Sequence, residues 1–278
     1  MTSGVQYTFA LMVYDTGTGE GQAVFESADS PPAGWDWKPG THLLAYGLGS
    51  DPNYFTARGE VDAALATGIY ATDLDSGETS LLVAPEKGLA LILPAWSPDG
   101  RFLGFDEHVY MEGRGPFAYY DFDAQEYIQW NEALGDYDWS PDGGQLAYDR
   151  LTYSAQGTER IYTRPRAGGE EVAVSPDLEQ GYAFSPVYSP DGTMLAYAIN
   201  PGNPENPQYK LVVQDLSSGE VRELDSLINF WGLEWSSDGK VLVYSNGPYE
   251  SAQVYGYDLR RGEAVALAEG REPSVARP

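Results

Sequence analysis

The sequence repeats one turn motif five times in register. Each copy places an aromatic residue before a Ser-Pro-Asp-Gly-type turn and a Leu-Ala-Tyr-type segment after it, as in WSPDGGQLAY at residues 139 to 148. The aromatic residues that open the copies are Trp37, Trp96, Trp139, Tyr188 and Trp235. Successive copies lie 43 to 59 residues apart, the length of one four-stranded sheet with its loops. This spacing predicts a tandem array of small β-sheets.

The residue types in each copy explain why one strand should end there and another begin. Proline fixes φ, the aspartate side chain can accept hydrogen bonds from nearby backbone, and glycine accepts positive φ. After the turn, Leu146, Ala147 and Tyr148 form an apolar run that predicts a strand covered on both faces. We expect the aromatic residue before the turn to pack between neighbouring sheets as a structural element. A second turn, Asp-x-x-x-Gly-Glu, predicts hairpins at 69 to 83, 211 to 224 and 254 to 267.

This combination of motifs resembles the TolB-like β-propeller family, and the resemblance covers nearly the whole chain. It implies that each blade starts at the Trp strand beside a central channel and continues outward through three more strands. It also implies six blades. The helical N-terminal domain of TolB has no counterpart in this sequence, which puts membership of the TolB envelope complex in doubt.

The two ends of the chain predict one composite blade. Residues 8 to 26 match the outer half of a repeat, and the C-terminal segment resembles an inner strand with Val275 in the aromatic place. We therefore expect an all-β fold, a six-bladed β-propeller of four-stranded antiparallel blades, with N- and C-terminal strands sharing one blade that closes the ring. It would form a single domain over 1 to 278. The closing blade would take about 1 to 30 plus 270 to 278, and the repeats start near residues 35, 94, 137, 186 and 233.

Composition excludes several classes of partner and site. The 42 acidic residues outnumber 16 basic ones and give a formal charge of −26, so a polyanion such as nucleic acid is not expected to bind. No apolar run is long enough to span a bilayer, and the absence of cysteine excludes disulfides and thiolate sites. We expect a monomer. The family resemblance implies an exported, periplasmic protein if a leader was removed, and a cytoplasmic one otherwise.

Function is expected on the face that carries the longer, irregular segments, because a rigid scaffold positions binding loops. These segments are 47 to 66, 106 to 116, 150 to 157, 200 to 208 and 246 to 251, with blade-to-blade links at 131 to 137, 175 to 183 and 225 to 232. Aromatic rings supply contact area and arginines can pair with carboxylates. The candidate binding residues are Tyr54, Phe55, Arg58, Tyr110, Arg114, Arg150, Tyr153, Tyr182, Phe230, Trp231 and Tyr249.

A separate group of residues is a candidate metal site. Asp106, Glu107 and His108, followed by Glu112, place three carboxylates near an imidazole in a predicted loop. Carboxylate oxygens suit a hard cation such as Ca²⁺. The alternative is an ordinary polar loop, because adjacent residues of a strand point to opposite sides. No other cofactor is expected.

The sequence contains no recognisable catalytic signature, such as a Gly-x-Ser-x-Gly elbow, a Walker loop or His-Glu-x-x-His. We expect a non-enzymatic binding or scaffold module that recognises a protein or peptide partner through the long-loop face and the channel mouth. The alternative is a metal-assisted or carboxylate-based hydrolase or lyase with acidic groups around the central channel. Prolyl-oligopeptidase-type peptidases have similar repeats, but the hydrolase domain that carries their chemistry has no counterpart here.

Overall fold

A computed structural model describes residues 9–14, 18, 20–27, 32–48, 68–85, 90–109, 113–150, 160–178, 181–202, 208–248, 251–271 and 273–275. The chain divides into two compact units. The first unit comprises Met1–Trp96 and Phe102–Glu132, and the second comprises Ser97–Arg101 and Ala133–Pro278. Within these described ranges, no helix is long and apolar enough to cross a membrane.

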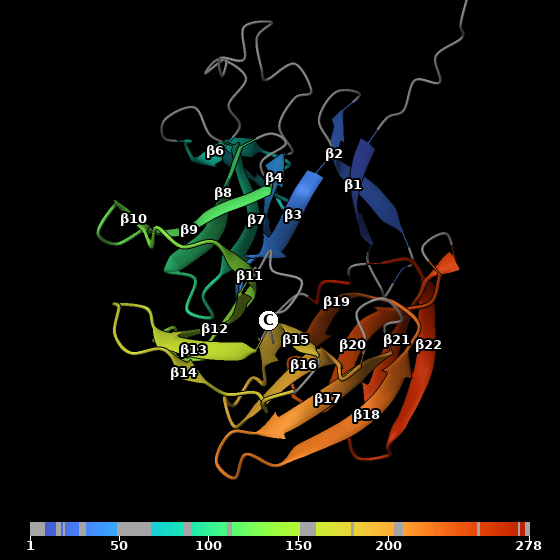
Figure 1. The fold of residues 1–278 in the computed structure, drawn as a ribbon. Helices are drawn as coiled ribbons and strands as arrows, with labels where there is room; N and C mark the ends of the chain where they lie inside the picture. Colours follow the sequence, from blue (N-terminus) through green and yellow to red (C-terminus); the bar gives the residue numbers. More distant parts are fainter. Residues whose placement is uncertain are drawn as a thin grey trace, which may run out of the picture. The chain divides into compact units, whose positions relative to one another are not determined.

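The first unit contains three antiparallel sheets (Figure 1). A two-stranded sheet pairs β1 (Phe9–Tyr14) with β2 (Gly21–Ser27). A four-stranded sheet follows, with β3 (Pro32–Trp37), β4 (Leu43–Leu48), β5 (Ile69–Asp73) and β6 (Thr79–Val83). A second one contains β7 (Ala90–Trp96), β8 (Phe102–Val109), β9 (Gly113–Asp121) and β10 (Glu126–Gln129). Neighbouring strands in each sheet follow one another in the chain.

The second unit contains three four-stranded sheets of the same order. The first has β11 (Leu134–Trp139), β12 (Gln145–Arg150), β13 (Ile161–Pro165) and the short β14 (Val172–Ala173). The next has β15 (Tyr182–Tyr188), β16 (Met194–Asn200), β17 (Tyr209–Asp215) and β18 (Val221–Leu227). The last has β19 (Phe230–Trp235), β20 (Val241–Asn246), β21 (Gln253–Asp258) and β22 (Glu263–Glu269). The innermost strand β15 lies against both β11 and β19.

These sheets confirm the all-β fold and the four-stranded antiparallel blades, but the predicted number of blades is wrong. The described residues form five four-stranded blades and one two-stranded sheet, in which β1 pairs only with β2. Residues 273 to 275, expected to supply an inner strand, lie outside any strand. The segment suits a strand poorly, because Pro273 has no N–H to donate and Val275 is its only large apolar residue.

The prediction of a long loop at 106 to 116 is also wrong over most of that range. β8 continues to Val109 and β9 begins at Gly113, and the two strands pair, for example Asp106 with Phe117. A β-carbon added at Gly115 would lie 2.0 Å from the carbonyl oxygen of Glu107. Glycine at position 115 therefore permits a close approach of the two strands.

Four of the five turn motifs are held by a serine–aspartate hydrogen bond, and the first, Trp37-Lys-Pro-Gly-Thr, has neither residue. The Oγ atoms of Ser140, Ser189 and Ser236 donate to the carboxylate two residues later, over 2.6, 2.7 and 2.8 Å. The following glycine adopts positive φ, as at Gly143 (65°), which only glycine accepts without strain. The Asp-x-x-x-Gly-Glu turns also form the predicted hairpins, β5–β6, β17–β18 and β21–β22.

The aromatic residue before the turn is buried in the core, as predicted, in the four repeats of Trp96, Trp139, Tyr188 and Trp235, whereas Trp37 is half-buried. Trp96, Trp139 and Trp235 are all at least 97% buried. The Trp235 indole N–H donates to the Val187 carbonyl of the preceding blade over 3.2 Å. A buried carboxylate adds a second link between blades, because Asp138 Oδ2 accepts the backbone N–H of Tyr188 at 2.7 Å.

Each inner strand also has an irregular register before its aromatic residue. The pairing with the second strand shifts at Leu134/Tyr137 in β11, Phe184/Val187 in β15 and Trp231/Leu233 in β19. In β15 the shift coincides with a φ of 54° at Ser185, whose N–H donates to Asp149 Oδ2 over 3.0 Å. Such bulges change the direction in which the flanking side chains point.

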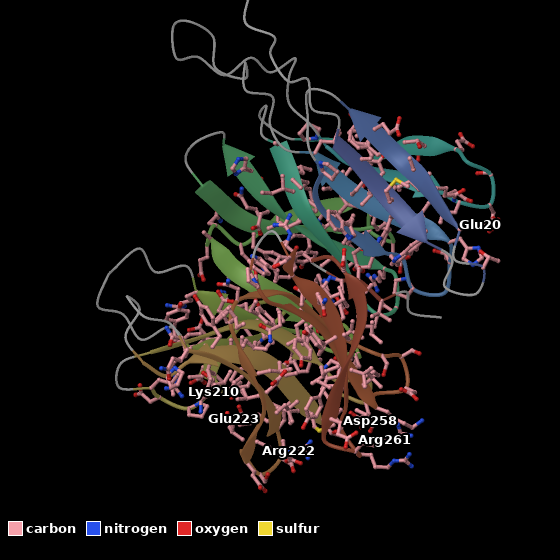
Figure 2. All side chains as sticks on the ribbon, turned by 90° about the vertical axis from the view of Figure 1, so that its right-hand side faces the viewer. Glu20, Lys210, Arg222, Glu223, Asp258 and Arg261 are labelled. Atoms are coloured by element: carbon pink, nitrogen blue, oxygen red, sulfur yellow. The ribbon has the colours of Figure 1, made fainter. Side chains whose placement is uncertain are left out.

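Charged pairs lie on the outer strands of the second unit (Figure 2). Lys210 on β17 contacts Glu223 on β18 at 2.6 Å, and Arg261 contacts Asp258 at 3.6 Å. Exposed ion pairs of this kind contribute about 0 to 1 kcal/mol each. The stability of the unit therefore depends on its buried apolar core more than on these surface charges.

We expect Trp139→Ala to lower the free energy of unfolding by about 3 to 5 kcal/mol, because it removes a fully buried indole and leaves a cavity. Urea denaturation followed by circular dichroism measures the change. Val265→Ala, at a position that is 60% exposed, is the control and should change stability by less than about 0.5 kcal/mol. Equal stability of Trp139→Ala and wild type would contradict the structural role of the motif.

The turns also predict a loss of stability in acid. Hydrogen bonds donated by Ser217 and Ser218 lower the pKa of Asp215 from 3.8 to about 2. A carboxyl group whose pKa is lower in the folded state stabilises the fold above its unfolded pKa, and this contribution is lost as the pH falls. The urea midpoint should therefore fall between about pH 4 and pH 2, and less steeply in Asp215→Asn. The exposed Glu170→Gln is the control; an equal change in both variants would argue against the turn.

Candidate functional site

The predicted aromatic residues of the second unit meet where three strands begin. β15, β17 and β19 start at Tyr182, Tyr209 and Phe230. β15 and β17 both pair antiparallel with β16, so they start at the same end of their sheet. The last residue of β18, Leu227, pairs with Tyr209, so β18 ends beside the start of β17. β19 then starts three residues after the end of β18. This end of two neighbouring blades is where the predicted long segments attach.

Four rings form a connected group at this position, which we call the loop-face cluster: Tyr182, Phe184, Tyr209 and Phe230. Phe184 lies at its centre, with ring centroids 5.5 Å from Tyr182, 5.7 Å from Tyr209 and 5.6 Å from Phe230. The last two contacts are edge-to-face, a favoured geometry for aromatic pairs. All four side chains are half-buried. The cluster is thus packed against the blades while part of each ring remains accessible.

Two hydroxyl groups give the loop-face cluster a polar, uncharged component. The Tyr182 and Tyr209 hydroxyl oxygens lie 3.4 Å apart. Burial, together with the hydrogen bond to Tyr182, raises the pKa of Tyr209 to about 12. Tyr209 therefore stays protonated at neutral pH and can donate or accept a hydrogen bond there.

Trp231 follows Phe230 of this cluster in the chain. It is half-buried, and the Arg271 guanidinium lies 6.0 Å from its ring centroid. The Ser245 hydroxyl donates to the Trp231 carbonyl, and Gly232 then adopts a φ of 72° at the irregular position of β19. Trp231 on β19 and Arg271, which follows β22, therefore place an aromatic ring beside a positive charge.

Arg150 is held by partners within its own blade. Its Nη2 atom lies 2.6 and 2.7 Å from the two carboxylate oxygens of Glu171, and its guanidinium stacks 5.1 Å from the Tyr162 ring centroid. Tyr148 donates its hydroxyl to the same carboxylate. The hydrogen bond to Glu171 raises the pKa of Arg150 further above its usual value. A role for Arg150 in binding a partner stays a prediction.

Several predicted binding residues lie outside the described residues: Tyr54, Phe55, Arg58, Tyr110, Tyr153 and Tyr249. Arg114 belongs to β9, where its backbone pairs with His108, but its side chain is outside the description. Among the predicted residues, the structure therefore brings together Tyr182 and Phe230. The ring that connects them, Phe184, and their neighbour Tyr209 were not predicted. Only their position could have indicated them. Both lie within the first three residues of a strand, at the end of the sheet to which the predicted long segments attach.

The predicted metal ligands lie largely within one strand. Asp106, Glu107 and His108 are consecutive residues of β8, the first two are buried, and the pairing with β9 shifts register between Asp106 and His108. Glu107 accepts a hydrogen bond from the Tyr127 hydroxyl over 2.7 Å and another from Gln129. Glu112 lies outside the description. No group of three or more His, Cys, Asp or Glu side chains that could hold a metal occurs in the described part of the chain.

Comparison with known proteins identifies the fold and no closer relationship. No family model and no curated protein matches the sequence. The crystal structure of TolB from Acinetobacter baumannii matches with a TM-score of 0.73 at 21% identity, over 97% of this chain and 63% of that one. An oligogalacturonate lyase in complex with manganese matches with a TM-score of 0.65 at 17% identity, over 94% and 70%.

A chain of the nidogen/laminin complex matches with a TM-score of 0.64 at 12% identity, over 96% of this chain and 92% of that one. The present chain thus spans less than two thirds of the TolB chain and nearly all of the chain from this complex. At such identities the similarity concerns the fold. The protein has a β-propeller fold of four-stranded antiparallel blades, similar to that of TolB.

Proposed function

We propose that the protein is a non-enzymatic binding module that recognises a protein or peptide partner through the loop-face cluster and Trp231. The observation that carries this proposal is the contact of Phe184 with three further rings from two blades, each of them half-buried. Aromatic residues that are packed in place lose little conformational entropy when they bind, which is why they dominate the energetics of many interfaces.

The chemistry of this surface suits a peptide more than a small ion. The rings offer apolar contact area, the two tyrosine hydroxyls can bond to peptide N–H and C=O groups, and Arg271 can pair with a carboxylate of the partner. The rings of the cluster lie near the starts of β15, β17 and β19, which belong to two rigid blades. Binding would therefore require little rearrangement of the scaffold.

The comparisons support a binding role at the level of the fold. A chain with this fold occurs in the nidogen/laminin complex, and TolB has the same fold with additional length. The identity of the partner does not carry over at 12 to 21% identity. On the family resemblance we further propose an exported, periplasmic location if a leader was removed and a cytoplasmic one otherwise, and we propose a monomeric state.

A metal-assisted lyase is the second candidate, because one protein of the same fold is an oligogalacturonate lyase in complex with manganese. The residues proposed for a metal in this chain are Asp106, Glu107, His108 and Glu112. A site for Ca²⁺ or Mn²⁺ would have to replace the hydrogen bonds that Glu107 now accepts.

The binding proposal predicts that Trp231→Ala and Phe230→Ala each weaken partner binding at least about tenfold, the size of an interface hot spot. Peptides selected on the wild-type protein from a random library would be measured against each variant by isothermal titration. Leu267→Ala, at a position that is 59% exposed on β22, is the control and should bind like wild type. Thermal melting verifies that all variants are folded. Selected peptides that bind all variants equally would refute the assignment of this surface.

The lyase candidate predicts a metal-dependent melting temperature. A cation bound only to the folded state raises stability according to its concentration and affinity. Adding millimolar Ca²⁺ or Mn²⁺ to protein treated with EDTA should raise the melting temperature by several degrees, and Glu107→Gln should abolish the rise. An unchanged melting temperature with both cations would eliminate a metal-assisted reaction at these residues.

A further inference from the structure

Asn200 is a buried amide at the end of β16, and its donor atom has no acceptor among the described residues. The side chain is fully buried, and Nδ2 makes no hydrogen bond there. Oδ1, in contrast, accepts the backbone N–H groups of Gly202 and Gln208, each over 3.3 Å. Exchanging the two amide atoms would place Nδ2 against these N–H donors, so the orientation of the amide is fixed. A buried donor without an acceptor is rare in folded proteins and points to a missing partner.

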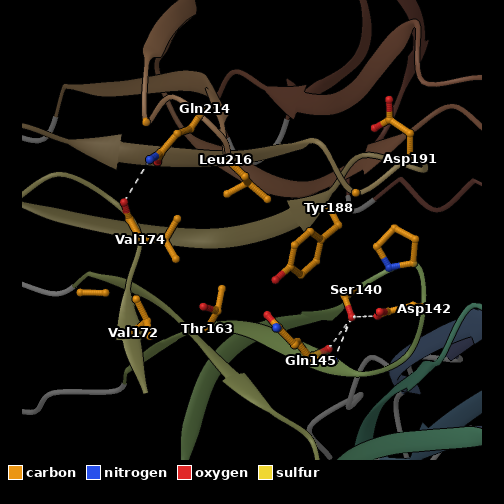
Figure 3. A pocket seen from close by; sticks show the side chains of 14 residues that line it. Ser140, Asp142, Gln145, Thr163, Val172, Val174, Tyr188, Asp191, Gln214 and Leu216 are labelled. Atoms are coloured by element: carbon orange, nitrogen blue, oxygen red, sulfur yellow. Dashed lines mark hydrogen bonds between the residues drawn. The ribbon is translucent and has the colours of Figure 1, made fainter. Parts of the chain in front are cut away.

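The other buried amide of this sheet is fully bonded. Gln214 on β17 accepts the Tyr197 hydroxyl at Oε1 over 2.8 Å, and its Nε2 donates to the Val174 carbonyl over 3.0 Å (Figure 3). Gln214 is therefore a structural amide that links two blades. The environment of Asn200 differs, because only its oxygen has a structural use.

An amide at the position of Asn200 is specific to this repeat. Asn200 comes three residues after Tyr197, the last residue of the Leu-Ala-Tyr-type segment. At the same position the other repeats have Gly49, His108, Leu151 and Gly247. The repeated scaffold therefore does not require an amide here.

The register of the sheet places Asn200 below two tyrosines of the loop-face cluster. Tyr182 on β15 pairs with Asn200, and Ile199 pairs with Lys210, so Asn200 also lies beside Tyr209 on β17. Directly opposite side chains lie on the same face of a sheet. β15 and β17 flank β16 and are about 10 Å apart, yet the two hydroxyl oxygens are 3.4 Å apart. The two rings therefore lean toward each other over β16, above the amide.

The contact between the two hydroxyl groups is weak. A separation of 3.4 Å is long for an O–H···O hydrogen bond, which is ordinarily about 2.7 to 2.8 Å. Only one of the two hydroxyl protons can be used in it, and both oxygens can still accept. A polar group placed between Tyr182 and Tyr209 could therefore bond to both hydroxyls and reach Asn200 below them.

We propose that Tyr182, Tyr209 and Asn200 together bind a primary carboxamide, a Gln or Asn side chain of the partner. This inference rests on the binding function proposed above and names the side chain that the partner inserts. The carboxamide oxygen accepts a hydrogen bond from Asn200 Nδ2, and the carboxamide NH₂ group donates to the two hydroxyl oxygens. Because Asn200 is fully buried, the two rings part to admit the group.

Other side chains fit these three groups less well. An ammonium or guanidinium group has only donors and would leave Asn200 Nδ2 without an acceptor. A carboxylate could accept from all three groups, but its charge would be desolvated among neutral partners, in a protein with a formal charge of −26. An apolar side chain would leave the amide donor unsatisfied.

The test uses peptides selected on the wild-type protein from a random library, and it retains those whose binding Phe230→Ala weakens. We expect the retained peptides to share a Gln or an Asn. Gln is then replaced by Glu or Met, and Asn by Asp or Leu, which keep the approximate shape of the side chain. Each replacement should weaken binding about tenfold or more in isothermal titration, because it removes a hydrogen bond to a buried group.

Substitution of Asn200 identifies the donor. Asn200→Asp keeps an oxygen for the two backbone N–H groups and removes Nδ2, so it should abolish the preference for the Gln peptide over its Met counterpart. Asn229→Asp is the matched control. It makes the same change beside Phe230, at an amide whose Nδ2 donates to the Gly247 carbonyl over 3.3 Å, and it should keep the preference. Thermal melting verifies that both variants are folded.

Substitution of the tyrosines tests the site independently of Asn200. Tyr182→Phe and Tyr209→Phe should each weaken binding of the Gln peptide about 3- to 10-fold, the effect of one hydrogen bond, and leave binding of the Met peptide unchanged. Both variants keep the ring and its packing, so they decide the question even where Asn200→Asp does not fold. Equal losses for the Gln and Met peptides would contradict a role of the hydroxyl groups.

Two outcomes would overturn the carboxamide site, and only one of them also overturns the loop-face assignment. Retained peptides that lack Gln and Asn, or that bind equally well with Met, would eliminate the carboxamide site and leave the aromatic surface in place. A water molecule below the rings would then be the partner of Asn200 Nδ2. Selected peptides that Phe230→Ala does not weaken would overturn both proposals.

Discussion

The serine–aspartate hydrogen bond within each Ser-x-Asp-Gly turn is the interaction on which the blades depend. It fixes the end of the inner strand and the start of the second strand, so it sets the register between them. A slip of one residue would turn buried side chains such as Leu146 and Tyr148 to the opposite face. Because the turn recurs at a constant place in these repeats, Trp96, Trp139, Tyr188 and Trp235 are all buried at the ends of their inner strands.

Contacts between blades depend in turn on the level at which successive inner strands end. Asp138 can accept the N–H of Tyr188, and the Trp235 indole can reach the Val187 carbonyl, only when successive inner strands end at the same level. A buried carboxylate that accepts a backbone N–H makes a strong hydrogen bond. Loss of the carboxylate would leave an unsatisfied N–H donor in the core. The loop-face cluster lies at the start of β15 in this framework.

The candidate sites could be predicted only in part. Tyr182 and Phe230 were identified as aromatic residues in irregular segments, and they do lie in one cluster. Phe184 was missed because it lies within a strand, where an aromatic ring is ordinarily part of the core.

The sequence by itself determined the four-stranded architecture of the five repeats, their order and the position of their turns. Those features depend on local chemistry, on Pro and Gly at fixed φ and on apolar residues in register, which a repeat displays five times. Only the tertiary structure decided that β1 and β2 form a sheet of two strands, that Gly115 belongs to a strand, and that β15 has a bulge at Ser185. These outcomes depend on which backbone groups of distant segments find partners, and no local pattern records that pairing.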